Sequence, residues 1–359
     1  MTNALMSQVV SRAARRVSMV GSCFGIAARI GGMGLALLPP LAASGEPIQL
    51  KLSFFASEQS DVYRDGIKPF VDAVNAEGKG LVAIKVYPNG ALGKALAEQP
   101  NMVLEGAADI AWVVPGQTPY RFPDNQILEM PGLFRDVREG TLVYTRLIAA
   151  NALRGYQDFF VIGTYTSAPN VIHGRKPLGS LAALKGQKIR ANNGVEAEAL
   201  NRLGAIPTVM PASRLADGLA QGTIDAIVMS PGGLFQFGTA HSAANHYLLG
   251  MGSAPLVVLM NRKKFDGLPA AARALIRKYS GERAAASWIE FFGAIEQRTL
   301  DKIKSDPTQK VVEPSPADRA AAQHVYESLI DAWAAKSAHN RELLKAIKAD
   351  LATIRAINR

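Results

Sequence analysis

The segment Lys185-Gly186-Gln187-Lys188-Ile189-Arg190 is the most informative part of this sequence. Its pattern predicts a loop and then a short strand that ends at Arg190. Residues 195–203 are predicted to be helical, with Asn193 at the start of that helix. A guanidinium is always charged, and its planar fork of donors matches a carboxylate. The helix start beside it offers free N–H groups and a positive dipole end. Together these features predict capture of a small carboxylate rather than a chemical reaction.

Residues 1–45 have the features of a cleavable signal peptide. They carry no acidic residue, and the uncharged run 30–43 is followed by small residues at 42–45 of the kind found at cleavage sites. Basic, apolar and small-residue parts in this order are typical of a segment removed on secretion. We therefore expect a secreted mature chain that begins at about residue 46. The basic residues of the segment are Arg12, Arg15, Arg16 and Arg29.

Three other interpretations of this segment have less support. A membrane anchor needs about 18–20 uncharged apolar residues, and Arg29 interrupts the run. The pair Arg15-Arg16 could belong to a twin-arginine signal, but the pair alone is weak evidence for one. Cys23 follows Arg16 too closely to leave the apolar run that a lipidation site requires.

The composition of the remaining chain excludes several function classes. The formal charge of +10 becomes +6 without the four arginines of the leader, and the other basic residues are dispersed. Dispersed charge does not indicate a nucleic-acid-binding face. The only cysteine is Cys23, so the mature chain has no disulfide, no thiolate nucleophile and no cysteine-ligated zinc. Roughly 310 residues exceed one comfortable core and predict two lobes.

Strands and helices alternate along the mature chain. Ile48, Leu50, Leu52 and Phe54 have the two-residue period of a strand, and the apolar residues of 62–74 have helical spacing. This alternation predicts an α/β fold with parallel or mixed sheets flanked by helices. Further strands are predicted at 81–87, 109–114, 159–165, 171–173, 188–191, 224–229 and 256–260, and further helices at 95–107, 195–203 and 213–220.

The C-terminal part of the chain is predicted to be helical. Residues 268–305 form an Ala-rich stretch, roughly 50 Å long if unbroken at 1.5 Å per residue, with a bend expected at Gly281. A helix of that length could reach across both lobes. Helices at 316–336 and 338–356 follow, and they leave open whether the protein is a monomer or a homodimer.

Five motifs follow one another in the mature chain. They are Tyr87-Pro88-Asn89-Gly90-Ala91-Leu92-Gly93-Lys94, Ala107-Ala108-Asp109-Ile110-Ala111, residues 181–190, Gly204-Ala205-Ile206-Pro207 with Met210-Pro211, and Gly222-Thr223-Ile224-Asp225-Ala226. In their order they resemble motifs of the DctP-like substrate-binding proteins of tripartite ATP-independent periplasmic (TRAP) transporters, and the resemblance covers residues 48–305. Ala183 departs from the Asp that is usual in the third motif, and residues 112–134 resemble one subgroup of the family.

The resemblance implies a two-lobed periplasmic binding protein fold of type II-like form. Its mixed sheets are flanked by helices, crossing strands form the hinge, and a long helix bridges both lobes. Lobe I would combine 46–166 with 255–296. Lobe II would combine 167–254 with 297–359, including the C-terminal helices.

The resemblance also implies the function and the partners. A small organic acid would bind in the cleft between the lobes, and closure would trap it. The loaded protein would then dock onto a small and a large integral membrane subunit. Residues 166–170 contain no arginine where sialic-acid-binding members carry a second one, so sialic acid is not expected.

The resemblance assigns some site residues directly. Arg190 falls on the carboxylate-binding arginine of the family, and Asn193 falls on a position that often contacts the ligand. Met229, Ser230 and Pro231 fall on the segment that lines the cleft, where relatives of this subgroup often carry an aromatic residue that is missing here.

Four further candidates lie at the carboxyl ends of predicted strands, where open α/β sheets bind ligands. Trp112 could line the cleft or belong to the core. Thr166 and Ser167 could donate hydroxyl groups to a ligand or cap a turn, and Ser57 has the same two interpretations.

No enzyme motif stands out in the sequence. The five histidines form no i,i+3 or i,i+4 pair, since even His241 and His246 are five residues apart. The chain has no G-x-S-x-G elbow, no P-loop and no dinucleotide fingerprint outside the leader. We therefore predict no catalytic residue, no metal site and no cofactor.

Two rival functions stay open at this point. A binding protein of an ABC-type transporter or of a sensor would share the fold and the cleft but have another membrane partner. A periplasmic enzyme that acts on a small organic acid could bring distant acid and base groups together. The sequence does not distinguish a keto acid, a hydroxy acid or an aromatic acid as the ligand.

Overall fold

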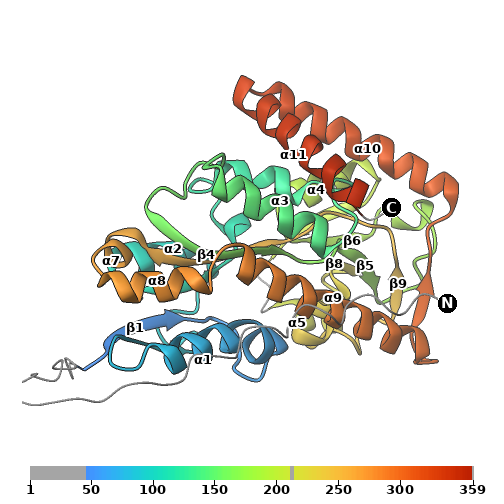
Figure 1. Cartoon of the computed structure of the whole chain (residues 1–359). Helices are drawn as coiled ribbons and strands as arrows, with labels where there is room; N and C mark the ends of the chain where they lie inside the picture. The colour runs from blue at the N-terminus through green and yellow to red at the C-terminus, as the bar shows by residue number, and fades with distance from the viewer. Residues whose placement is uncertain (1–45, 211–213, 358–359) are drawn as a thin grey trace, which may run out of the picture. The chain divides into compact units, whose positions relative to one another are not determined.

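The computed structural model describes residues 46–210 and 214–357 (Figure 1). The signal peptide predicted for residues 1–45 and the motif residue Pro211 lie outside these described residues. Two β-sheets with helices packed on them make up the described chain. Within it, no helix is both long and apolar enough to cross a membrane.

The first sheet has five strands in the order β2-β1-β3-β10-β4. Strand β1 is parallel to β2 and β3, whereas β10 is antiparallel to β3 and β4. Leu50 and Leu52 of β1 are fully buried, as their two-residue period predicts. The strands are β1 (Ile48–Ser53), β2 (Val82–Tyr87), β3 (Ile110–Val113), β4 (Phe159–Thr166) and β10 (Pro255–Asn261).

The second sheet has six strands in the order β11-β9-β5-β8-β6-β7. Strand β6 is parallel to β7 and β8, β11 is parallel to β9, and β5 is antiparallel to β8 and β9. The predicted α/β class with mixed sheets is therefore confirmed. The strands are β5 (Val171–Gly174), β6 (Lys188–Ala191), β7 (Ile206–Val209), β8 (Ala226–Met229), β9 (Asn245–Tyr247) and β11 (Lys310–Val312).

Helices and helical turns connect the strands of both sheets. They are η1 (Val62–Ile67), α1 (Lys68–Glu77), η2 (Leu96–Glu98), α2 (Gln99–Glu105), η3 (Pro115–Gln117), η4 (Pro123–Glu129), α3 (Val137–Ala149), η5 (Ala182–Leu184), α4 (Gly194–Arg202), α5 (Leu215–Gln221), α6 (Pro231–Gln236), α7 (Arg262–Asp266), α8 (Ala270–Lys278), α9 (Glu282–Ser305), α10 (Pro316–Ala335) and α11 (Ala338–Ile357). The regular helix expected at 95–107 is shorter than predicted because a helical turn, η2, takes its first residues.

Two chain segments cross side by side between the sheets. One joins β4 to β5 and the other joins β9 to β10. The Ser167 N–H donates to the Ala254 carbonyl (2.9 Å), the Asn170 N–H to that of Gly252 (2.8 Å), and the Met251 N–H to that of Asn170 (2.7 Å). These paired segments are the crossing strands that the two-lobed fold requires.

Helix α9 contacts elements of both sheets. It packs on β4 of the first sheet, and on α6 and β11 of the second part of the chain. The expected bend at Gly281 is a complete break, because Gly281 has φ 63° and separates α8 from α9. A positive φ of this kind suits glycine. The single stretch predicted for 268–305 is therefore wrong, and the 24-residue α9 does the bridging.

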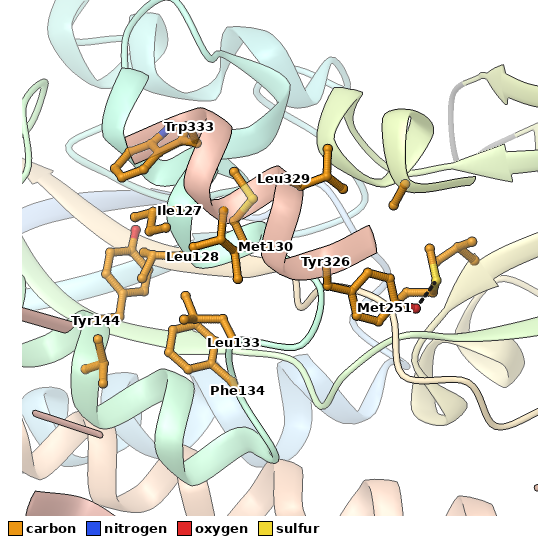
Figure 2. Close-up of a cluster of buried hydrophobic side chains, with 14 of the residues drawn as sticks. Ile127, Leu128, Met130, Leu133, Phe134, Tyr144, Met251, Tyr326, Leu329 and Trp333 are labelled. Atoms are coloured by element: carbon orange, nitrogen blue, oxygen red, sulfur yellow. Dashed lines mark hydrogen bonds between the residues drawn. The ribbon is translucent and has the colours of Figure 1, made fainter. Parts of the chain in front are cut away.

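The C-terminal helices pack against the buried side chains of η4 and form one hydrophobic core with them (Figure 2). Trp333 and Leu329 of α10 pack with Ile127 and Met130, and the Tyr326 hydroxyl donates to the Met251 sulfur at 3.3 Å. Helix α11 contacts α3. The lobe boundaries expected from the sequence stay a prediction, because these helices contact elements assigned to both lobes.

An ion pair fixes the start of α3 to the end of α11. Asp136 caps α3 by accepting the Glu139 N–H at 2.8 Å, and Glu139 in turn accepts the Arg135 N–H at 3.0 Å. Arg355 of α11 donates two bonds of 2.7 Å to the same carboxylate. The charge of Arg355 and these hydrogen bonds lower the pKa of Glu139 although its burial acts in the opposite direction. Helix α3 is absent from the sequence predictions.

Candidate functional site

A cavity of about 700 Å³ lies between the two sheets. Both crossing segments contribute to it through Ser167, Asn170 and Ala254. One wall comes from the β1–η1 connection and the strands of the first sheet, and the other comes from β8, α6 and the second half of α9. Its other lining residues are Ser57, Gln59, Ser60, Asp61, Val62, Arg64, Asp65, Trp112, Tyr165, Asn192, Met229, Ser230, Gly232, Gly233, Phe235, Phe237, Leu256, Phe292, Ile295, Glu296, Arg298, Thr299 and Lys302.

Arg190 lies behind this cavity and not on its surface. Its residue is only 4% exposed, its Nε donates to the Met210 carbonyl at 3.3 Å, and its Nη1 donates to the side-chain oxygen of Asn192. Asn192 does line the cavity. Burial lowers the pKa of Arg190, but a guanidinium stays protonated. The structure thus places one asparagine between the predicted carboxylate-binding charge and the cavity.

Glu196 holds two of the lining residues in place. Its buried carboxylate accepts the backbone and side-chain N–H groups of Asn192, both at 2.8 Å, and the side-chain amide of Asn170 at 2.5 Å. Burial raises the pKa of Glu196, against the effect of these hydrogen bonds and of the Arg190 charge. Because Asn192 and Asn170 come from different segments, Glu196 sets their separation in the cavity.

Asn193 is the N-cap of α4, as the sequence predicts. Its side-chain oxygen accepts the Glu196 N–H at 2.9 Å. It is not among the lining residues, since that bond turns its side chain toward the helix. The spacing Asn193-x-x-Glu196 is that of a capping box, and this signal could have identified Glu196 from the sequence.

An aromatic wall covers the first-sheet side of the cavity. Trp112 stacks on Phe55 with ring centroids 4.5 Å apart, and its indole N–H donates to the Tyr165 hydroxyl at 2.8 Å. Tyr165 stacks in turn on Phe292 of α9 at 4.3 Å. Trp112 is 3% exposed, so it belongs to the core and also lines the cavity. Both interpretations given to it from the sequence hold together.

The remaining candidate residues differ in which cavity, if any, they line. Ser57, Ser167, Met229 and Ser230 line the cavity with Trp112. Pro231 lines a second cavity of about 640 Å³. Thr166 is fully buried against α3, where its backbone N–H donates to the Thr141 hydroxyl at 3.1 Å, so it is turned away from the first cavity.

Glu296 of α9 is a lining residue that the sequence did not indicate. Its carboxylate accepts the Gly232 N–H of α6 at 2.8 Å. Burial raises the pKa of Glu296 more than its hydrogen bonds to Gly232 and Ser230 lower it. It therefore joins α9 to the start of α6 and contributes a carboxyl group to the cavity wall.

A histidine pair lies behind Met229 in the second sheet. His173 and His246 face each other across β5 and β9 with their Nδ1 atoms 2.7 Å apart, and His173 Nε2 is 3.2 Å from the Met229 carbonyl. One Nδ1 must donate and the other accept, so at most one of the two rings can be charged. Burial and the neighbouring ring lower the pKa of His173 to about 3, and burial lowers that of His246.

The histidine pair makes the stability of the protein depend on pH. The unfolded chain takes up protons near pH 6.5 and the folded pair does not, so stability falls as the pH drops from 6.5 toward 3. Replacing both His173 and His246 with Asn should remove at least about 2 kcal/mol, the contribution of His173 alone, from the stability difference between pH 7.5 and pH 5, as measured by urea denaturation. The exposed His241→Asn variant should keep the wild-type pH dependence. An unchanged pH dependence in the double variant would contradict the neutral pair.

Among the described residues, no three His, Cys, Asp or Glu side chains come together as a possible metal site. The cavity instead offers amide and hydroxyl donors, a buried positive charge behind them and an aromatic wall. Hydrogen bonding to an anionic group and packing on an apolar body are the interactions that this arrangement supports.

Comparisons with known proteins agree with this arrangement. A family model described as "Bacterial extracellular solute-binding protein, family 7" matches residues 53–337. The C4-dicarboxylate-binding periplasmic protein DctP of Rhodobacter capsulatus is 24% identical over 343 residues, which cover 90% of this chain and 97% of that protein. The 2,3-diketo-L-gulonate-binding periplasmic protein YiaO of Escherichia coli K12 is 26% identical and covers 82% and 89% respectively.

Solved structures are similar in fold. A marine metagenome TRAP solute-binding protein specific for aromatic acids, in complex with metahydroxyphenylacetate, has a TM-score of 0.79 at 24% identity, covering 85% of this chain and 99% of its own. A TRAP solute-binding protein of Rhodoferax ferrireducens with copurified benzoate has a TM-score of 0.78 at 23% identity, covering 87% and 100%. At these identities the structures show the fold alone.

Proposed function

We propose, from the premise that this chain belongs to the bacterial extracellular solute-binding proteins of family 7, that it captures a small organic acid as its carboxylate and delivers it to a TRAP-type membrane transporter. The family predicted from the sequence is thereby confirmed, since the match spans residues 53–337. A binding protein of an ABC-type transporter is not supported by this membership.

The cavity between the two sheets is the proposed ligand site. The observation that carries this assignment is the network in which Glu196 fixes Asn192 and Asn170 at the cavity surface, with Arg190 directly behind Asn192. Asn170 donates one of its two amide N–H groups to Glu196 and can donate the other to a carboxylate, whereas Asn192 donates both of its side-chain N–H groups to Glu196 and Val228. The buried guanidinium adds an attractive field where water is scarce. Relatives that bind C4-dicarboxylates or diketogulonate support an acidic ligand.

We assign the body of the ligand to the aromatic wall. Trp112, Tyr165 and Phe292 offer ring faces and edges to an apolar group, whereas the amides lie toward the second sheet. A monocarboxylate with an aromatic or other apolar body would satisfy both sides at once. The aromatic acids bound by two structurally similar proteins support this choice.

Capture would proceed by closure about the paired crossing segments. Contacts to the aromatic wall and to Asn192 come from different sheets, and a ligand would make both together only when the lobes approach one another. The ligand would therefore shift the population toward the closed state by as much as it binds that state more tightly. The lobes proposed are 46–166 with 255–296 and 167–254 with 297–359.

A thermal-shift screen of the mature protein tests the ligand class. Benzoate and related aromatic monocarboxylates should raise the melting temperature by a few degrees at about one hundred times their dissociation constant. Benzamide, which has the same ring without the charge, is the matched control and should have no effect. If C4-dicarboxylates stabilise the protein and aromatic acids do not, the proposed apolar body is wrong. If no acid stabilises it, the proposed function itself fails.

The remaining parts of the proposal concern location, partners and chemistry. Family members are periplasmic, and we infer secretion through the N-terminal segment and docking of a monomer or homodimer onto two integral membrane subunits. We further propose that the bound acid is released unchanged and that the protein is not an enzyme. Mass spectrometry of the acid after incubation with the protein should find no product.

A further inference from the structure

A second cavity, of about 640 Å³, lies on the opposite face of a crossing segment. Ser167 and Asn170 line the first cavity, whereas Ala168, Pro169 and Val171 line the second. The two cavities therefore share the hinge without being one space, and the carboxylate of Glu296 lines both.

The walls of the second cavity come from the hinge and from residues of α3, α6, α9 and α10. Ile289, Gly293, Gln297 and Leu300 lie on one face of α9, and the first turn of α3 faces them. The other lining residues are Gly132, Phe134, Arg135, Asp136, Val137, Arg138, Pro231, Leu248, Gly250, Met251, Glu296 and Arg319.

Three guanidinium groups line this cavity. The Arg138 Nη1 atom is buried and has no hydrogen-bond partner in the described part of the chain. Arg319 is partly neutralised, because its Nη2 lies 2.9 Å from a Glu313 carboxylate oxygen. No described carboxylate lies within ion-pair distance of the Arg135 or Arg138 side chain. A buried N–H without an acceptor is unfavourable. An acceptor supplied by a ligand would remove this cost at Arg138.

The acidic residues at this cavity are occupied elsewhere. Asp136 caps α3 through the Glu139 N–H, and Glu296 accepts the Gly232 N–H. Burial also raises the pKa of Glu296. The start of the 13-residue α3 adds the positive end of a helix dipole beside Arg138.

Gly293 keeps the α9 side of the cavity open. A Cβ atom built on Gly293 would meet no atom within 4 Å. Glycine within a helix is less favourable than alanine, so the absence of a side chain here is a cost to α9 that packing does not require.

We propose that this second cavity binds a compact oxyanion with at least two negative charges, held by Arg138 and Arg135 with support from Arg319. Two unpaired guanidinium groups match two charges, and planar N–H forks match oxyanion oxygens. This site is separate from the one that takes the organic acid.

Calorimetric titration of the mature protein with inorganic phosphate at low salt tests this site. Wild-type protein should bind phosphate, and sodium chloride should give no binding heat. Arg138→Gln should weaken phosphate binding about tenfold, as loss of one charge-assisted contact predicts. Gly293→Leu should weaken it as well by filling the cavity. Arg341→Gln, which removes a charge from the exposed face of α11, should bind like the wild type.

Three outcomes would overturn the proposal. One is the absence of phosphate binding by the wild type, and another is unchanged binding in either Arg138→Gln or Gly293→Leu. The third is loss of phosphate binding in Arg190→Ala with retention in Arg138→Gln, because phosphate would then enter the first cavity. Gly293→Leu has open space around the new side chain, so it keeps the test valid if Arg138→Gln does not fold.

Discussion

Replacing Arg190 with Ala is expected to lower the affinity for the organic acid at least about tenfold, or about 1.4 kcal/mol. Arg190 supplies the buried positive charge behind Asn192 and also holds the Asn192 side chain through its Nη1. Charge-assisted hydrogen bonds contribute about 1.5–3 kcal/mol each. Isothermal titration calorimetry with the acid found by thermal shift measures the loss.

Three variants identify the cause of such a loss. Arg190→Lys keeps the charge but not the planar fork, and should recover only part of the affinity. Arg298→Ala removes an arginine that lines the same cavity from α9, and should have a much smaller effect. Glu196→Gln removes the acceptor that orients Asn192 and Asn170, so it should weaken binding without removing a positive charge. Unchanged affinity in Arg190→Ala, with normal circular dichroism, would sink the site assignment.

Replacing Trp333 with Ala is expected to lower the free energy of unfolding by about 3–5 kcal/mol. Trp333 is 3% exposed and lies in the cluster of Figure 2 with Ile127 and Leu128 of η4. Removing its ring would leave a cavity that the rigid neighbours fill only in part. Urea denaturation followed by circular dichroism measures the change.

A substitution on the exposed face of the same helix provides the control. Asp331→Ala should change stability by less than about 0.5 kcal/mol, because Asp331 is exposed and lies two residues before Trp333 on α10. A loss in Trp333→Ala as small as in Asp331→Ala would mean that α10 adds little to the core.

Local periodicity explains the parts of the fold that the sequence predicted. Leu50 and Leu52 alternate with polar residues because only one face of β1 is buried, and the N-cap at Asn193 follows from its position before α4. Strand β9 has no such pattern, because both of its faces are buried and two of its three residues are polar. A strand of this kind is recognisable only from its partners in the sheet.

The site was harder to predict than the fold, because it depends on the direction in which each side chain points. The sequence places Tyr165, Thr166 and Ser167 at the end of one strand, but not which face each side chain occupies. The structure turns Tyr165 and Ser167 toward the cavity and Thr166 toward α3. The local spacing Asn193-x-x-Glu196 pointed to Glu196 as part of a helix cap, but its contact with Asn170, which lies 26 residues earlier in the chain, could not be predicted from a local pattern.

The packing of α10 and α11 determines when an apolar surface of the folding chain becomes covered. Tyr326 and Trp333 cover side chains of η4 and the hinge residue Met251, so this apolar layer stays wet until the last helices have been synthesised. A nascent chain that ends before α10 would expose that layer and attract holding chaperones. The apolar layer on η4 is therefore covered only when the last two helices pack on it, wherever the chain folds.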